Sequence, residues 1–373
     1  MGKTADFGDE PAAGHRSPTA GQEENEKSKL RSLFESLRLI HKRPGNAPQR
    51  LVLNADDFGL SPSVNRSILR AAEEGLLKSA SLMVTHAAAQ DAVLAAAASP
   101  VPLALGLHFC LTSGRACAPP EEIPLLADRD GRLKRGFLGL TRLLKSSRFA
   151  EARIQARREL AAQWAEFDRL TQMAPNCPVD HLDSHQHIHV LPGLFLPLMA
   201  DARKRNLILR IPAERIGAVS RLFAGPPVFR ARGIAKKMIL DHFIRTDGRE
   251  FSPFVLSETF GAGDFDPDAG YFGILDSGRM NEAAILRILK TLPRLARRGT
   301  TDLFEINLHP WRIAGEENVV PETASDADRR FGLSPRREEE WNALCSQRLR
   351  ETITRLGIEI TAFGRAIAES DRD

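Results

Sequence analysis

Hydrophobic and polar positions follow two alternating patterns from residue 50 to residue 363. Short runs of consecutive apolar residues, typical of strands buried on both faces, alternate with segments whose apolar residues recur at helical spacing. We expect strands at 51–55, 79–87, 102–109, 179–184, 207–212, 302–308 and 358–363. We expect helices from Ser61-Pro62 to residue 72 and at 92–99, 149–173, 192–205, 281–297 and 338–355. This alternation predicts an α/β fold, with a parallel sheet that helices cover on both faces.

The N-terminal part of the chain lies outside this alternation. Residues 1–28 are polar and predict a disordered tail. Residues 29–43 place apolar side chains on one helical face with basic residues around it, which predicts a short amphipathic helix. That helix either docks on the domain or lies on a membrane surface or a partner. We therefore divide the chain into an extension, 1–49, and one domain, 50–366, in which 314–337 is rich in loops.

A second amphipathic segment, 216–249, follows the predicted strand at 207–212 and mixes large apolar residues with Arg and Lys. Because it leaves the end of a strand, we expect it at the rim of the sheet. Two interpretations stay open: a capping helix packed on the rim, or a lid that contacts an amphiphilic, lipid-linked sugar.

Composition excludes several classes of protein. The chain has 373 residues, and 52 Lys and Arg oppose 48 Asp and Glu, a balance that gives no argument for nucleic-acid binding. Its four cysteines form no C-x-x-C pair, which argues against a zinc ribbon and a disulfide framework. We see neither a membrane-spanning stretch nor a secretory signal, so we expect a cytoplasmic protein, with peripheral membrane contact as the alternative.

Reactive side chains fall at the ends of the predicted strands. The carboxyl ends of parallel strands in a barrel converge on one mouth, where catalytic groups gather. Five strand ends carry such residues, which is hard to produce by chance. They are Asp56 and Asp57, then His108, then His185, His187 and His189, then Arg210, and then His309.

Two of these groups predict a metal site. Adjacent carboxylates, as in Asp56-Asp57, repel each other unless a cation compensates, although a solvated turn is the alternative. The segment 181–189 carries four of the ten histidines of the chain, and imidazole is the commonest side-chain metal ligand. In a strand, His185, His187 and His189 would share one face. Spacing alone does not select the ligand among them.

These residues bring the sequence close to a known family. The motifs N-A-D-D-F-G at 54–59, G-L-H-F at 106–109, H-L-D-S-H-Q-H-I-H at 181–189, L-R-I at 209–211 and L-H-P at 308–310 resemble those of the YdjC-like carbohydrate deacetylases, whose site is similar to that of NodB-type polysaccharide deacetylases. The resemblance covers roughly residues 50–313. It implies a distorted TIM-like (β/α) barrel and removal of an N-acetyl group from an amino sugar.

The resemblance also implies residue roles. Asp57, His108 and His185 would hold a divalent metal ion. Asp56 would be the general base, oriented by Arg210. His309 would be the general acid, and we expect it, facing carboxylates, to stay protonated to near neutrality or above. His187 and His189 would support the ligands or contact substrate, and Trp311, where the family often has a small residue, would alter the pocket floor.

The residue types suit this chemistry. A metal held by two imidazoles and one carboxylate keeps positions open for water and the amide oxygen. The family favours Mg²⁺, whereas two imidazoles suit Zn²⁺ or another transition metal better, so both stay open.

Other functions remain as alternatives. One is a metal-dependent phosphoesterase on a similar barrel, and another is a non-catalytic sugar- or lipid-binding relative. The substrate is expected to be an acetylated oligosaccharide or glycolipid. A lipid-linked one follows only by analogy with members of the family that act in hopanoid-lipid synthesis.

Overall fold

The structure is a computed structural model of the whole chain, and it describes residues 49–212, 214, 234–243, 270–297 and 303–364. The expected tail and amphipathic helix before residue 49 lie outside these residues. Most of the expected lid segment also lies outside them.

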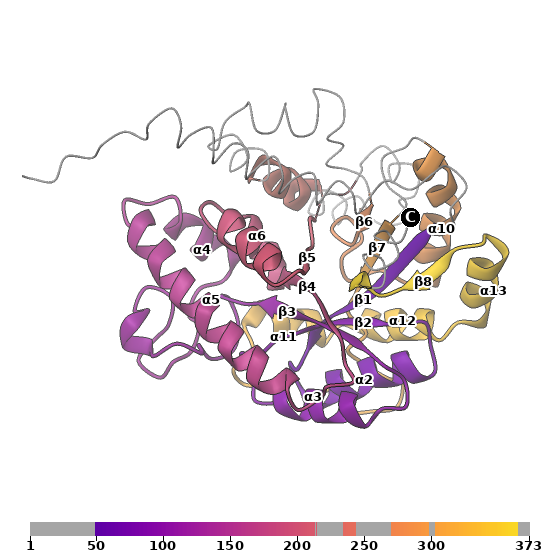
Figure 1. Cartoon of the computed structure of the whole chain (residues 1–373), viewed down its shortest axis with the longest axis horizontal. Coiled ribbons are helices and arrows are strands. Elements are labelled where there is room, and N and C mark those ends of the chain that lie inside the picture. The colour runs from indigo at the N-terminus through magenta and orange to yellow at the C-terminus, as the bar shows by residue number, and fades with distance from the viewer. Residues whose placement is uncertain (1–48, 213, 215–233, 244–269, 298–302, 365–373) are drawn as a thin grey trace, which may run out of the picture.

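One parallel sheet forms the centre of the molecule (Figure 1). Its order is β5-β4-β3-β2-β1-β7-β6, and β8 also pairs with β1. Every strand pair is parallel, which confirms the α/β prediction. The strands are β1 Arg50–Phe58, β2 Ser79–Leu82, β3 Ala104–Phe109, β4 Val179–Ser184, β5 Ile208–Leu209, β6 Tyr271–Phe272, β7 Leu303–Leu308 and β8 Glu359–Thr361. Among the described strands, β5 and β6 end the sheet, which is therefore a distorted, incompletely paired barrel.

Helices flank the strands, with α4, α5 and α6 on one side of the view and α10 and α13 on the other (Figure 1). The helix α2 starts as predicted, because the Ser61 side chain accepts a hydrogen bond from the backbone of Val64 and Pro62 occupies the first turn. The helices are α2 Pro62–Glu73, α3 Ala89–Ala98, α4 Phe137–Leu143, α5 Phe149–Thr171, α6 Phe195–Lys204, α10 Glu282–Arg297, α11 Asp326–Gly332, α12 Arg336–Leu344 and α13 Gln347–Arg355. A further helix occupies residues 234–243, and short 3-10 turns occupy Pro120–Glu122 and His185–Val190.

The structure differs from the prediction at the helix expected over 338–355 and at β6. The single helix expected at 338–355 is two helices, α12 and α13, because the Ser346 side chain caps a new helix by accepting from the Leu349 backbone at 3.1 Å. The two-residue strand β6 was not predicted. It is too short to give a pattern in the sequence.

The strands are buried on both faces, as their continuous apolar runs predict. The strands β1, β2, β3 and β7 are buried along their whole length. Trp311 is also fully buried, against Phe331 and beside Gly332, so it packs in the core. Among the described helices, none has the length and apolar character needed to span a membrane.

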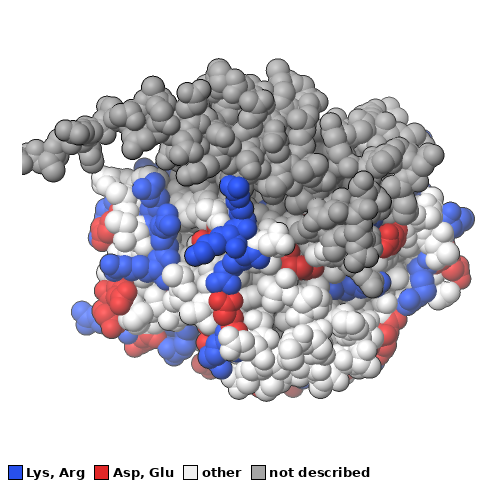
Figure 2. Space-filling model, viewed as in Figure 1, with Lys and Arg blue, Asp and Glu red and all other residues white. Residues whose placement is uncertain are grey.

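Charge is distributed over the surface. On the face that Figure 2 shows, acidic and basic side chains of the described residues are interspersed. This distribution agrees with the near balance of charges in the sequence.

Candidate metal centre

The end of β1 brings two consecutive carboxylates to one place. In a regular strand Asp56 and Asp57 would point to opposite faces. Here the pairing of β1 with β2 shifts register between Ala55 and Phe58, and Asp57 has a left-handed backbone with φ +69°. Aspartate tolerates this conformation better than most residues. The local turn therefore lets both side chains reach the same site.

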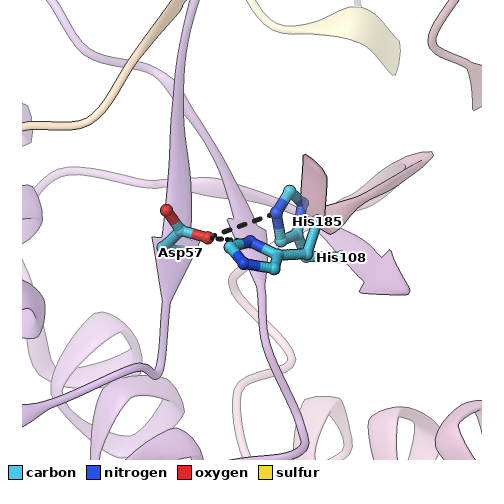
Figure 3. A group of neighbouring side chains, drawn as sticks. All are labelled: Asp57, His108 and His185. Carbon is cyan, nitrogen blue, oxygen red and sulfur yellow. Dashed lines mark hydrogen bonds and ion pairs between the residues drawn. The ribbon is translucent and has the colours of Figure 1, made fainter. Parts of the chain in front are cut away.

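Asp57, His108 and His185 form a compact cluster from three strand ends (Figure 3). Oδ1 of Asp57 lies 2.9 Å from Nδ1 of His185 and 3.3 Å from Nε2 of His108. All three side chains are buried, and their ligand atoms lie within 4.8 Å of one another. The cluster could hold a metal ion.

The outer nitrogen of each imidazole binds a carboxylate. Nδ1 of His108 donates to Asp183 at 2.7 Å, and Nε2 of His185 donates to Asp328 at 3.0 Å. Metal-binding histidines usually have such a partner, which fixes the ring and leaves the other nitrogen free to coordinate. Nε2 of His108 is buried, faces Asp57 and has no hydrogen-bond partner, so the donor set fits a cation.

The charges around the cluster shift the pKa values of its three side chains. Burial opposes the charged form of His108, yet Asp183 and Asp56 raise its pKa to about 10. Burial also opposes the charged form of His185, but Asp328 and Asp57 raise its pKa well above the usual value. Against the effect of burial, the two histidines hold the pKa of Asp57 well below its usual value. A metal ion binding here must therefore displace protons from the imidazoles.

Asp56 is held by a separate set of donors. Its Oδ2 accepts from Arg210 at 3.1 Å and from Asn307 at 2.9 Å, and its Oδ1 accepts from Asn54 at 3.0 Å. The predicted contact between Arg210 and Asp56 is thus present, and both side chains are buried. This arrangement fixes the orientation of the carboxylate.

Arg210 also fills the space beside the cluster. It pairs with Asp183 and with Glu305, the latter at 2.6 Å. Asp56, His108 and Asp183 form a second group whose ligand atoms are close enough for a metal ion. Because Arg210 already neutralises both of its carboxylates, that group is a poor second metal site. A two-metal phosphoesterase therefore gains no support.

His309 faces both carboxylates of the pair, with its Nε2 3.9 Å from Oδ2 of Asp56 and 3.9 Å from Oδ2 of Asp57. The backbone N–H of His309 donates to Glu340 at 2.6 Å, and Phe331 packs edge-on against its ring. Burial lowers the pKa of His309, although three nearby carboxylates act in the opposite direction. The expectation that His309 stays protonated to neutrality or above is therefore wrong for this structure.

The three alternating histidines do not share a face, because β4 ends at Ser184. Residues His185–Val190 form a 3-10 turn in which Gln186 and His187 have left-handed backbones. Only His185 reaches the cluster. His187 lies beside Tyr271, with Nε2 3.4 Å from its hydroxyl.

His189 has a structural contact instead. Its Nε2 donates to the backbone carbonyl of Arg210 at 3.0 Å, and its Nδ1 accepts from Ser184 at 2.5 Å. It thus joins the ends of β4 and β5 and fixes the backbone that carries Arg210. His181 lies deeper, and a Cβ at position 106 would approach its ring to 2.3 Å. The glycine of the G-L-H-F motif makes room for that ring.

Sequence reasoning missed several residues of the site. The sequence gives a signal for Asp183 and Glu305, because each is a carboxylate inside a predicted strand. The sequence gives no signal for Asp328, because it lies in the region expected to be loop-rich, 143 residues from His185. Its contact arises only from the tertiary fold.

Comparison with known proteins supports the family resemblance and the fold. The model of a family described as YdjC-like protein matches residues 50–355. A carbohydrate deacetylase of Brevibacillus brevis is 33% identical over 163 residues, which are 44% of this chain and 59% of that protein. A chitooligosaccharide deacetylase of Klebsiella pneumoniae is 35% identical over 167 residues, or 44% of this chain and 60% of that protein. The chain thus spans about three fifths of the length of the curated relatives it matches.

A solved structure from Enterococcus faecalis, described as a candidate cellobiose-phosphate cleavage protein, shares the fold. Its TM-score is 0.56 at 23% identity, and the match covers 85% of this chain and 98% of that one. At this identity the likeness bears on the fold alone.

Proposed function

The chain belongs to the YdjC-like protein family, and from that membership we propose that it is a metal-dependent carbohydrate N-deacetylase. Its reaction would be hydrolysis of the acetamide of an acetylated amino sugar, with release of acetate. One observation carries the proposal. A buried Asp–His–His cluster lies beside a firmly held carboxylate, Asp56, and a histidine, His309, that faces both. The relatives named as carbohydrate and chitooligosaccharide deacetylases support the substrate class. The proposed deacetylase domain is 50–366.

Asp57, His108 and His185 are the proposed metal ligands. A divalent cation held there would polarise the acetyl carbonyl and make the attacking water more acidic. We propose a divalent ion without choosing between Mg²⁺, which the family favours, and Zn²⁺ or another transition metal, which two imidazoles favour.

Asp56 is the proposed general base. It accepts a proton from the water molecule that attacks the acetyl carbon, and Arg210 and Asn307 keep its Oδ2 oriented during the transfer. Glu305 holds Nε of Arg210 at 2.7 Å from the other side. Arg210 therefore acts on the base and not on the substrate.

His309 is the proposed general acid. The bond between the acetyl carbon and the amide nitrogen breaks, and His309 gives a proton to that nitrogen so that it leaves as an amine. The lowered pKa of His309 means that the proton must be acquired against burial. The two carboxylates 3.9 Å away favour that protonation.

The substrate proposed is an oligosaccharide or a glycolipid. A lipid-linked sugar would find Met238 and Ile239 exposed on the helix at 234–243, with 63% and 37% of their surface accessible. All four cysteines are unpaired, which supports the reducing, cytoplasmic location we also propose.

The test is acetate release from N-acetylglucosamine oligosaccharides and from an N-acetylated glycolipid, with and without a chelator. We expect release that the chelator abolishes and added metal restores. A phosphomonoester serves as the control substrate, and release of phosphate without acetate would favour the phosphoesterase alternative. Acetate release that is indifferent to the chelator would contradict the metal-dependent mechanism.

A further inference from the structure

We propose that Asp328 is a positioning residue for the metal centre, and that it holds the imidazole of His185 so that Nδ1 faces the bound cation. The inference rests on the proposed role of His185 as a metal ligand. It assigns a function to α11, an element that contributes none of the strand-end residues predicted from the sequence.

The contact itself is short and buried. Oδ1 of Asp328 accepts from Nε2 of His185 at 3.0 Å, and the side chains of both residues are at least 93% buried. The opposite ring nitrogen, Nδ1, lies 2.9 Å from Oδ1 of Asp57. A proton kept on Nε2 by a carboxylate leaves the lone pair of Nδ1 directed at the cluster.

The Asp328 carboxylate is itself held in place. Its Oδ2 accepts from the hydroxyl of Ser325 at 2.7 Å, and the same hydroxyl caps α11 by accepting from the Asp328 backbone at 3.2 Å. The backbone of Ser325 donates to Ser113 at 3.2 Å, and Ser113 lies 3.4 Å from Nε2 of the buried His86. The first turn of α11 is therefore tied to the loop that follows β3.

The other metal-binding imidazole has a matching partner of different origin. His108 is oriented by Asp183, which lies on β4 and is neutralised by Arg210 inside the barrel. His185 is oriented by a carboxylate on α11, a helix that follows β7 in the chain. Both imidazoles thus have a carboxylate on the side away from Asp57, an arrangement that a merely structural ion pair would not require.

The test compares Asp328→Asn with Asp326→Asn in the full chain. Both substitutions remove one acidic charge from the first turn of α11, but Asp326 is exposed and makes no contact with His185. Binding of Co²⁺ is measured by titration, and the geometry of the site by the visible absorption of the bound ion. We expect Asp328→Asn to weaken Co²⁺ binding roughly 10- to 100-fold and to change the spectrum. Asp326→Asn should do neither.

Folding is checked by melting each variant in the presence of chelator. If Asp328→Asn fails to fold, Ser325→Ala replaces it, since this change keeps the carboxylate but frees its Oδ2, and we expect a smaller loss of Co²⁺ affinity with a changed spectrum. Co²⁺ affinity and spectrum equal to those of Asp326→Asn would overturn the inference.

Failure of the inference about Asp328 is distinguishable from failure of the proposed function. A wild-type chain that binds Co²⁺ through His185, as shown by loss of binding in His185→Ala, but releases no acetate would refute the function and leave the role of Asp328 intact. Acetate release by the wild type, together with unchanged Co²⁺ binding in Asp328→Asn, would support the function and refute the role of Asp328.

Discussion

At the scale of single residues, Asp56 and Asp57 are chemically identical neighbours with different surroundings. Asp57 contacts two imidazoles, whereas Asp56 contacts a guanidinium and two amides. This difference in environment supports the proposed division of the pair into a ligand and a base.

We expect Asp56→Asn to keep the metal ion and lose turnover by about a hundredfold or more, because the change removes a base and not a ligand. Asp57→Asn, His108→Ala and His185→Ala should lose both metal and turnover. Elemental analysis measures the bound metal and an assay measures acetate release, and together they distinguish loss of a base from loss of a ligand. Loss of metal from Asp56→Asn with retention by Asp57→Asn would reverse the assignment.

The role of His309 can be separated from that of the metal by the leaving group. A phenolate leaves an acetyl ester without protonation, whereas an amine must be protonated to leave an acetamide. We expect His309→Ala to lower acetamide turnover on the order of a hundredfold and ester turnover far less.

The pKa of His309 adds a second readout. Because a general acid must be protonated and burial lowers this pKa from 6.5, acetamide turnover by the wild type should fall with rising pH, and the midpoint of the fall should lie below pH 6.5. Ester turnover should lack that fall. Equal losses on both substrates in His309→Ala would remove the general-acid role.

At the scale of elements, the helix at 234–243 packs beside the turn that follows β4 and beside β6. Leu240 packs with Val190, Tyr271 and Ile274, and Lys236 lies one turn earlier on the same face. Lys236 is half-buried and interacts electrostatically with Asp56, and burial lowers its pKa to about 8. Because Lys236 interacts with the proposed base, we infer that its ammonium donates to oxygens of the substrate.

If Lys236 binds substrate as a cation, its affinity for substrate should fall as the amine loses its proton. We expect the KM for an acetylated oligosaccharide to rise above pH 8 in the wild type. Lys236→Arg should remove this rise, since a guanidinium stays charged. Met238→Ala, on the exposed face of the same helix, is the control. An unchanged alkaline rise in Lys236→Arg would show that another group titrates.

Elements were predictable where their pattern is local. The apolar runs of β1, β3 and β7 and the Ser-Pro start of α2 depend on neighbouring residues, and the sequence revealed them. The break between α12 and α13 follows from another local signal, the Ser346 cap, which the single helix expected there did not take into account. The turn at His185–Val190 contains left-handed backbones at Gln186 and His187 that the pattern of the sequence does not reveal. For that reason the alternation of the three histidines does not place them on one face.

At the scale of the whole molecule, parallel topology made the site predictable. Because the carboxyl ends of β1, β3, β4, β5 and β7 meet, residues distant in sequence could be grouped before any distance was known. Other side chains orient these residues: Glu305 binds Arg210, and Asp328 binds His185. These contacts depend on tertiary packing, which no local sequence pattern predicts.

The buried histidines of the molecule titrate in two opposite directions, and this determines how the metal-free protein responds to pH. His86 and His189 are kept neutral by burial, which lowers the pKa of each from 6.5 to about 4. An unfolded chain binds protons more readily at these positions, so their contribution to stability is present above pH 6.5 and is lost as pH falls towards 4.

His108 behaves in the opposite way, since its pKa is raised from 6.5 to about 10 despite burial. Its contribution is complete below pH 6.5 and is lost as pH rises through 10. With chelator, we therefore expect the melting temperature to be highest near pH 6.5 and to fall on both sides. A bound cation replaces the protons of His108 and His185, so excess metal should remove the alkaline fall and leave the acidic one. Differential scanning calorimetry from pH 4 to pH 10, with chelator and with metal, measures both limbs. An alkaline fall that metal does not remove would mean that the imidazoles keep their protons and do not bind the ion.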